Sequence, residues 1–134
     1  MELKEQKFGI EIEMTGITRA KAAEVTAEYF GTRVKYLGTY YDTYAAIDTE
    51  GRQWKFMSDG SITAQKKSNG RKINAGREYQ TEIVSPICRY EDIVTIQEII
   101  KNNDTHYDGL TILSNQLNIS PTIYLNFYFK QYLK

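Results

Sequence analysis

Apolar and polar side chains alternate along residues 8–14, a pattern typical of a β-strand with one buried face. The apolar positions are Phe8, Ile10, Ile12 and Met14. Glu11 and Glu13 then share the opposite face, with Cα atoms ~6.5 Å apart at a rise of ~3.3 Å per residue. Both carboxylates can therefore reach one cation or one substrate amine. An ordinary half-solvated strand has the same pattern, so these two acids alone do not define a site.

A helix is predicted to follow, from an N-cap at Thr18 to about Phe30, with Gly31 at its end. Small and aromatic side chains recur along it at helical spacing, and the charged residues fall on the other face. We expect it to pack on the sheet through Ala20, Ala23, Ala27 and Phe30.

Residues 34–57 are rich in Tyr, Val and Thr and predict further strands of the same sheet. Residues 34–47 form one or two strands, and residues 53–57 return after a turn to complete a hairpin. The Asp59-Gly60 pair that follows is first of all a turn signal. At the edge of a sheet that carries acids, Asp59 could also orient an amine or complete the coordination of a cation.

Residues 78–85 predict another strand, in which Gln80, Glu82 and Val84 share one face. A carboxylate in such an apolar strand is unfavourable unless it is paired or bound to metal. We therefore expect Glu82 to face Glu11 and Glu13, with the three carboxylates within ~8 Å. Isoleucines at helical spacing then predict a helix over residues 90–101.

Residues 64–77 form a basic segment that also contains Ser, Asn and Gly, a composition typical of a mobile loop. Such loops are usually only solvated. Beside an acidic site, however, this one could clamp the phosphates of a nucleotide. The candidate cofactor-binding residues are Lys66, Lys67, Arg71, Lys72 and Arg77.

Composition narrows the classes of function. Lys plus Arg and Asp plus Glu number 17 each, so no global field favours nucleic acid or an anionic membrane. The single cysteine, Cys88, excludes an internal disulfide framework. No apolar run approaches the ~18 residues of a membrane span. We expect a soluble cytoplasmic protein.

Three of these motifs, in this order, resemble the amidoligase family, whose relatives include glutamine synthetase and glutamate–cysteine ligase. They are residues 8–13 (FGIEIE), 58–61 (SDGS) and 81–86 (TEIVSP), followed by the helix that begins at residue 90. The resemblance covers roughly residues 8–102 and implies an α+β fold, an antiparallel sheet backed by helices. It also implies ATP-dependent amide formation, in which a carboxylate becomes an acyl phosphate and magnesium bridges the phosphates.

The resemblance assigns roles to four residues of this chain. Glu11, Glu13 and Glu82 would be metal ligands, and Asp59 a residue of the substrate site, so that Asp59 and Glu82 are the candidate catalytic residues. Hard divalent cations take oxygen ligands and stabilise charge on a transferring phosphoryl group, which agrees with this assignment.

The rest of the chain departs from that family. A Cys-Gly-x-His-x-His motif would follow the helix, but His106 is the only histidine and lies in a turn-like stretch. Residues 104–134 instead predict an aromatic-rich segment, with a short helix over 110–117 and a second over 122–133. We expect it to pack on the domain formed by residues 1–103 or on a partner chain.

Three functions remain open. We favour a shortened amidoligase-like protein without turnover that binds another protein, for example a phage or mobile-element inhibitor such as an anti-CRISPR protein. The alternative is an active ATP- and magnesium-dependent ligase, with either an unconventional site or a site shared with a second chain through the C-terminal segment. A helix-turn-helix DNA-binding regulator is weakest, because the candidate recognition helix is apolar nearly all round and offers only Lys130 and Lys134 to phosphate.

Overall fold

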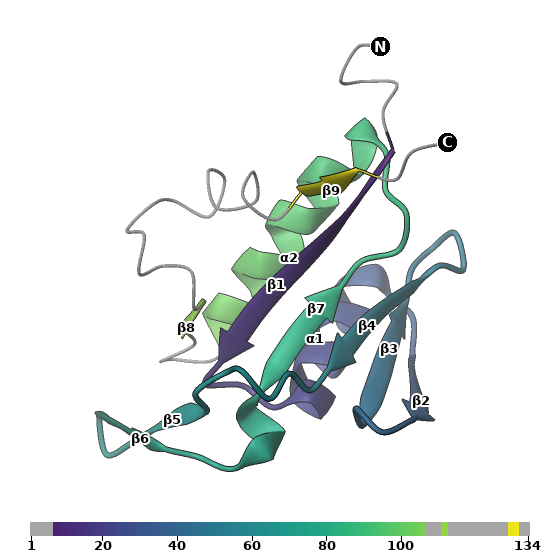
Figure 1. Cartoon of the computed structure of the whole chain (residues 1–134). Coiled ribbons are helices and arrows are strands. Elements are labelled where there is room, and N and C mark those ends of the chain that lie inside the picture. The colour runs from purple at the N-terminus through teal and green to yellow at the C-terminus, as the bar shows by residue number, and fades with distance from the viewer. Residues whose placement is uncertain (1–6, 107–110, 113–128, 132–134) are drawn as a thin grey trace.

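An antiparallel sheet with helices α1 and α2 behind it forms the body of the chain (Figure 1). The computed structural model describes residues 7–106, 111–112 and 129–131. In sheet order the strands are β2 (Val34–Gly38), β3 (Thr43–Ile47), β4 (Gln53–Met57), β7 (Thr81–Val84), β1 (Phe8–Thr15) and β8 (Thr111–Ile112), and β9 (Phe129–Gln131) also pairs with β1. Every pairing is antiparallel, which confirms the α+β prediction.

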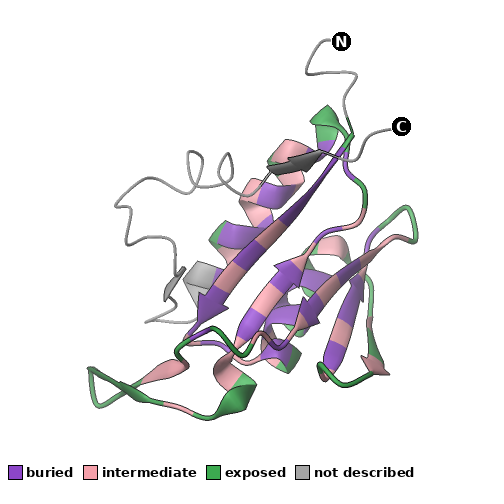
Figure 2. Ribbon diagram, in the orientation of Figure 1, coloured by how far each residue is buried: buried purple, intermediate pink, exposed green. Residues whose placement is uncertain are grey.

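Strand β1 pairs with β7, β8 and β9 and has the buried face that the alternation predicted. Its apolar side chains at positions 8, 10, 12 and 14 are at most 3% exposed, whereas Glu11 and Glu13 are half-buried on the other face (Figure 2). Phe56 and Ile83 from the neighbouring strands complete the buried face. The side of the sheet that carries the acids is therefore the side away from the helices.

Helix α1 (Arg19–Phe30) has the predicted boundaries. The Oγ1 of Thr18 accepts a hydrogen bond from the backbone N–H of Lys21, and Gly31 adopts the left-handed conformation that ends the helix. The predicted inner face was partly wrong, because Ala20 is exposed. The buried side chain of Arg19 takes the inward position in the first turn instead. The other buried residues of the helix are Ala22, Ala23, Val25, Thr26 and Ala27.

Helix α2 (Ile93–His106) follows a short 3-10 turn, η3 (Tyr90–Asp92), and packs against α1. Its buried isoleucines confirm the helical spacing in the sequence. The amide of Asn103 joins the two helices, since its Nδ2 donates to the Oγ1 of Thr26 at 3.2 Å. The backbone at His106 belongs to the last turn of α2, so the turn predicted there was wrong.

The basic segment is not a mobile loop but a hairpin of β5 (Gln65–Ser68) and β6 (Arg71–Asn74), which extends away from the main sheet (Figure 1). Its turn is formed by Asn69 and Gly70, both with positive φ, the conformation of a tight hairpin turn. After it, a 3-10 turn, η2 (Arg77–Tyr79), takes the place of the first residues of the strand predicted over 78–85.

The two helices predicted at the C-terminus are wrong where the structure describes them. Thr111–Ile112 and Phe129–Gln131 are strands β8 and β9, which pair with the two ends of β1 on the side away from β7. Residues 110, 113–117, 122–128 and 132–133 of those predicted helices lie outside the described residues. The division of the chain into a domain of residues 1–103 and a C-terminal segment of residues 104–134 stays a prediction. Among the described residues, no helix is long and apolar enough to cross a membrane.

Candidate functional site

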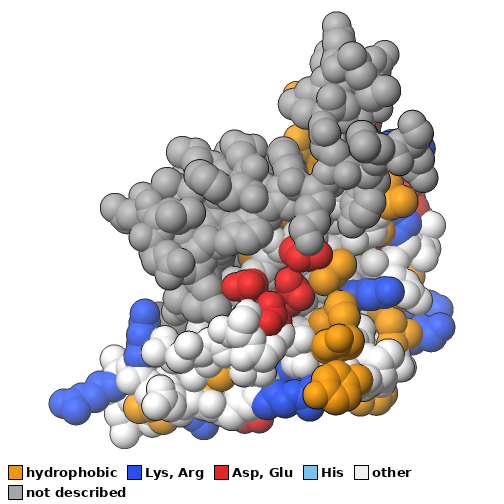
Figure 3. All heavy atoms as spheres, viewed as in Figure 1, with side chains coloured by type: hydrophobic (Ala, Val, Ile, Leu, Met, Phe, Trp, Pro, Cys, Tyr) orange, Lys and Arg blue, Asp and Glu red, His pale blue; other side chains and the backbone are white. Residues whose placement is uncertain are grey.

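Three carboxylates project from the face of the sheet that lies away from the helices. Glu13 on β1 lies directly opposite Glu82 on β7, and Glu11 lies opposite Val84. Residues opposite each other in an antiparallel pair project to the same face, and so do residues two apart in one strand. Glu11, Glu13 and Glu82 therefore share the face away from the helices, where acidic side chains gather in Figure 3.

Asp59 joins these acids from the turn after β4. The backbone N–H and the hydroxyl of Ser61 both donate to its Oδ1, at 2.9 Å and 2.7 Å, and so fix the carboxylate. One oxygen from each of Glu13, Asp59 and Glu82 lies within 4.8 Å of the others. We call these three residues, together with Glu11, the acidic cluster.

The electrostatics of the acidic cluster reflect like charges held close together. Burial, followed by the charges of Glu11 and Asp59, raises the pKa of Glu82 to about 7. Burial, followed by the charge of Asp59, also raises the pKa of Glu13. The two hydrogen bonds from Ser61 lower the pKa of Asp59 and so favour its ionised form. Near neutral pH the carboxyl of Glu82 is therefore partly protonated, and a cation could replace this proton.

The donor set fits a divalent cation. Magnesium and calcium take carboxylate oxygens at ~2.0–2.6 Å, so oxygens on opposite sides of one ion lie up to ~5 Å apart. The oxygens of Glu13, Asp59 and Glu82 are already within that span. Among the described residues, none of these three carboxylates forms an ion pair with Lys or Arg. A bound cation would supply the missing positive charge.

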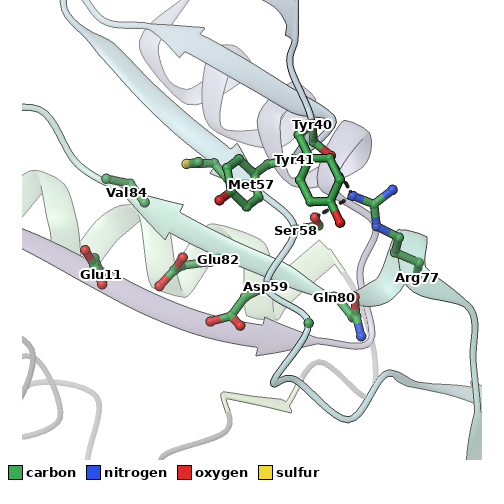
Figure 4. Close-up of a pocket in the computed structure, with 11 residues that line it drawn as sticks. Glu11, Tyr40, Tyr41, Met57, Ser58, Asp59, Arg77, Gln80, Glu82 and Val84 are labelled. Carbon is green, nitrogen blue, oxygen red and sulfur yellow. Dashed lines mark hydrogen bonds between the residues drawn. The ribbon is translucent and has the colours of Figure 1, made fainter.

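A cleft of about 510 Å³ adjoins the acidic cluster. Glu11, Asp59 and Glu82 line one end, and Tyr40, Tyr41 and Arg77 line the other (Figure 4). Tyr40 and Tyr41 fall in the Tyr-rich stretch for which strands were predicted, and no sequence pattern connected them with the site. The available signal was the pair of chain breaks at Gly38 and Asp42, which place the tyrosines in a turn between β2 and β3.

The predicted phosphate clamp is only partly assembled. Of its five basic residues, Arg77 alone lines the cleft. Lys66, Lys67, Arg71 and Lys72 belong to the β5–β6 hairpin, where the ammonium of Lys66 lies 5.7 Å from the ring centroid of Tyr79. Arg77 therefore shares the cleft with Glu11, Asp59 and Glu82, and the other four basic residues do not line it.

Arg19 is a residue of the site that the sequence analysis missed. It is 4% exposed, and its guanidinium donates to backbone carbonyls of Asp42, Arg77 and Gln80. Nothing in the local sequence distinguishes Arg19 from a solvent-exposed arginine in the first turn of a helix. Its role depends on three segments that are distant along the chain.

One comparison with known proteins gives a match. The family model described as "Putative amidoligase enzyme" matches residues 4–109, which include the acidic cluster and the cleft. Neither the curated proteins nor the solved structures contain a match to the chain. Since the family model covers most of the sequence and the predicted motifs meet in one place, the chain belongs to the amidoligase family.

Proposed function

We propose that the acidic cluster binds a divalent cation and forms the metal half of an amidoligase site. The observation that carries this proposal is that carboxylate oxygens from β1, β7 and the turn after β4 lie within 4.8 Å of one another. Repulsion between Glu13 and Glu82 opposes this arrangement, and a cation would relieve it. The match to the amidoligase family supports the same reading.

The chemistry that fits is the ATP-dependent joining of a carboxylate to an amine. Glu13 and Glu82 would hold magnesium, with Asp59 or Glu11 as a further ligand. Magnesium, when bound, supplies positive charge against a transferring phosphoryl group. The carboxylate of Asp59, fixed by Ser61, is placed to orient an amine in the cleft. The cleft has room for a substrate beside the acids.

A second candidate is binding without turnover, and the distribution of basic residues favours it. Phosphoryl transfer requires several positive groups held in place, and losing one such donor typically lowers the rate ~10²–10³-fold. Arg77 is the basic residue that lines the cleft among those the structure describes. In this case the cation would stabilise a surface for another protein, as a phage or mobile-element inhibitor would require.

Both candidate functions require the acidic cluster to bind a divalent cation. Calorimetric titration with magnesium and manganese tests this binding. Wild type should bind either ion, whereas Glu13→Gln and Glu82→Gln should lose at least about tenfold in affinity. Glu28→Gln, on the exposed face of α1, removes the same charge away from the cluster and should bind like wild type. Equal binding by all four proteins would overturn the proposal.

Turnover then separates the two candidates. With ATP, magnesium and a mixture of amino acids as carboxylates and amines, the ligase predicts steady release of ADP that Glu82→Gln abolishes. The binding protein predicts cation binding without release of ADP above the no-enzyme control.

A further inference from the structure

The end of the cleft away from the acidic cluster contains a positively charged and aromatic surface that the cation site does not use. Tyr40 and Tyr41 lie on the turn between β2 and β3, and Arg77 approaches them from η2 (Figure 4). The ring centroids of the two tyrosines are 5.3 Å apart, edge to face. We call these three residues the Arg77 wall.

The guanidinium of Arg77 is held in place but keeps donors for a ligand. Its Nη2 donates to the backbone carbonyl of Tyr40 at 2.8 Å and to the Oγ of Ser58 at 3.0 Å. The carbon of the guanidinium lies 5.9 Å from the centroid of the Tyr40 ring. These contacts use one nitrogen, so the N–H groups of Nε and Nη1 remain available. No carboxylate forms an ion pair with Arg77 among the described residues.

The buried side chain of Arg19 fixes the Arg77 wall from behind. Its Nη1 donates at 2.7 Å to the backbone carbonyls of both Arg77 and Gln80. These two hydrogen bonds hold the 3-10 turn η2 in place. Its Nη2 donates at 2.9 Å to the Oδ2 of Asp42, which holds the turn that carries the tyrosines. One guanidinium therefore sets the positions of the two chain segments that form the wall.

The turn that carries the tyrosines has an unfavourable backbone. Thr39 and Asp42 have φ values of 65° and 50°, and positive φ is rare for a β-branched residue such as Thr. The phenol of Tyr36 donates to Asp42 at 2.6 Å and helps Arg19 to hold the turn. As a result Tyr40, which is 84% exposed, is kept against the cleft rather than packed in the core.

We propose that the Arg77 wall binds an oxyanion, a carboxylate or a phosphate, attached to a ring that stacks on Tyr40 or Tyr41. The oxyanion accepts a charge-assisted hydrogen bond from the Nε–H of Arg77, a donor that the contacts with Tyr40 and Ser58 do not use. A ligand long enough to span the cleft then places its other end at the acidic cluster. The statement that such a ligand is a substrate rests on the proposed function. The binding of an anion at the Arg77 wall does not, because it needs no cation.

Nuclear magnetic resonance titration of the full chain in the presence of EDTA tests the proposal. The probes are benzoate and phenyl phosphate, with acetate and inorganic phosphate as the same oxyanions without a ring. The aromatic probes should shift the Nε–H signal of Arg77 and the backbone signals of Tyr40 and Tyr41. They should bind at least about threefold more tightly than the probes without a ring, because stacking on an aromatic side chain adds affinity. Whichever aromatic probe binds more tightly identifies the oxyanion.

Matched variants connect this binding to the guanidinium. Arg77→Gln should weaken binding of the better probe about tenfold. Arg77→Lys should recover only part of it, because a flexible ammonium is not fixed by Tyr40 and Ser58 as the guanidinium is. Arg33→Gln removes an equal charge from an exposed position before β2 and should bind like wild type. If Arg77→Gln does not fold, the shifts in wild type and the affinity of Arg77→Lys decide the question. Shifts that avoid the wall, or unchanged affinity in the Arg77 variants, would overturn the inference.

The Glu82→Gln variant separates this inference from the proposed function. It should lose cation binding and keep binding of the aromatic probe. Probe binding at the Arg77 wall without any cation binding by wild type would leave the inference standing and remove the proposed function. Cation binding by wild type without probe binding would overturn the inference and leave the proposed function standing.

Discussion

Glu13 and Glu82 lie directly opposite each other on neighbouring antiparallel strands. Residues so paired have Cα atoms only ~4.5–5.5 Å apart, and like charges in this position destabilise a sheet. The turn after β4 adds a third carboxylate, that of Asp59, whose ionised form is favoured by the hydrogen bonds from Ser61. The fold thus holds together carboxylates that repel each other. A cation bound between them would reduce this repulsion.

Cation affinity should rise with pH around neutrality. The pKa of Glu82 is about 7, so below that value a proton competes with the cation for its carboxylate. We expect manganese to bind up to about tenfold more tightly at about pH 8 than at about pH 6, as measured by calorimetry. Glu28→Gln should show the same profile as wild type. An affinity independent of pH would show that Glu82 is not a ligand.

Glu82→Gln should stabilise the cation-free protein at alkaline pH. The folded-state pKa of about 7 lies above the ordinary value of 4.5, so the native state binds more protons between those values. The contribution of Glu82 to the free energy of unfolding is therefore fully present below about pH 4.5 and is lost as pH rises through about pH 7. Because Glu82 is only half-buried, we expect a gain on the order of 1 kcal/mol at about pH 8 and almost none at about pH 4. Urea unfolding with EDTA at both pH values measures it, and a loss of stability at alkaline pH would contradict the interpretation.

Replacement of Arg19 should destabilise the fold. Arg19→Met leaves the carbonyls of Arg77 and Gln80 and the carboxylate of Asp42 without their buried partner, which should cost about 2–4 kcal/mol. Arg19→Lys should recover little, because one ammonium cannot reach acceptors on both segments. Urea denaturation measures the effect. Arg33→Met is the matched control, and similar stability of the two methionine variants would refute the role given to Arg19.

Charges on the β5–β6 hairpin should have little effect on the cation site. Arg71 and Lys72 are exposed and do not line the cleft. Exposed charges are screened beyond ~8 Å at physiological salt, so Arg71→Gln and Lys72→Gln should change magnesium affinity by less than about twofold. Calorimetry at physiological salt measures this. A tenfold change in either variant would place the hairpin over the cleft and restore the phosphate-clamp hypothesis.

The elements predicted correctly were those that depend on patterns among residues close together in the sequence. The alternation in residues 8–14 and the caps at Thr18 and Gly31 predicted β1 and α1 with nearly their final boundaries. The hairpin was missed although Asn69-Gly70, a strong signal for a tight turn, was present, because basic composition was given more weight. Both C-terminal helices were predicted from local spacing, whereas β8 and β9 form by pairing with a strand about a hundred residues earlier.

The sequence by itself determined that Glu11, Glu13 and Glu82 lie on polar faces of strands, since the direction of a side chain in a strand depends only on its own segment. Only the tertiary structure decided that β1 pairs with β7 in the register that places Glu13 opposite Glu82. It also decided that Asp59 completes the cluster and that Arg19 holds Arg77 beside Tyr40. These contacts join residues from separate segments, and their distances depend on the packing of the whole sheet, which no local pattern encodes.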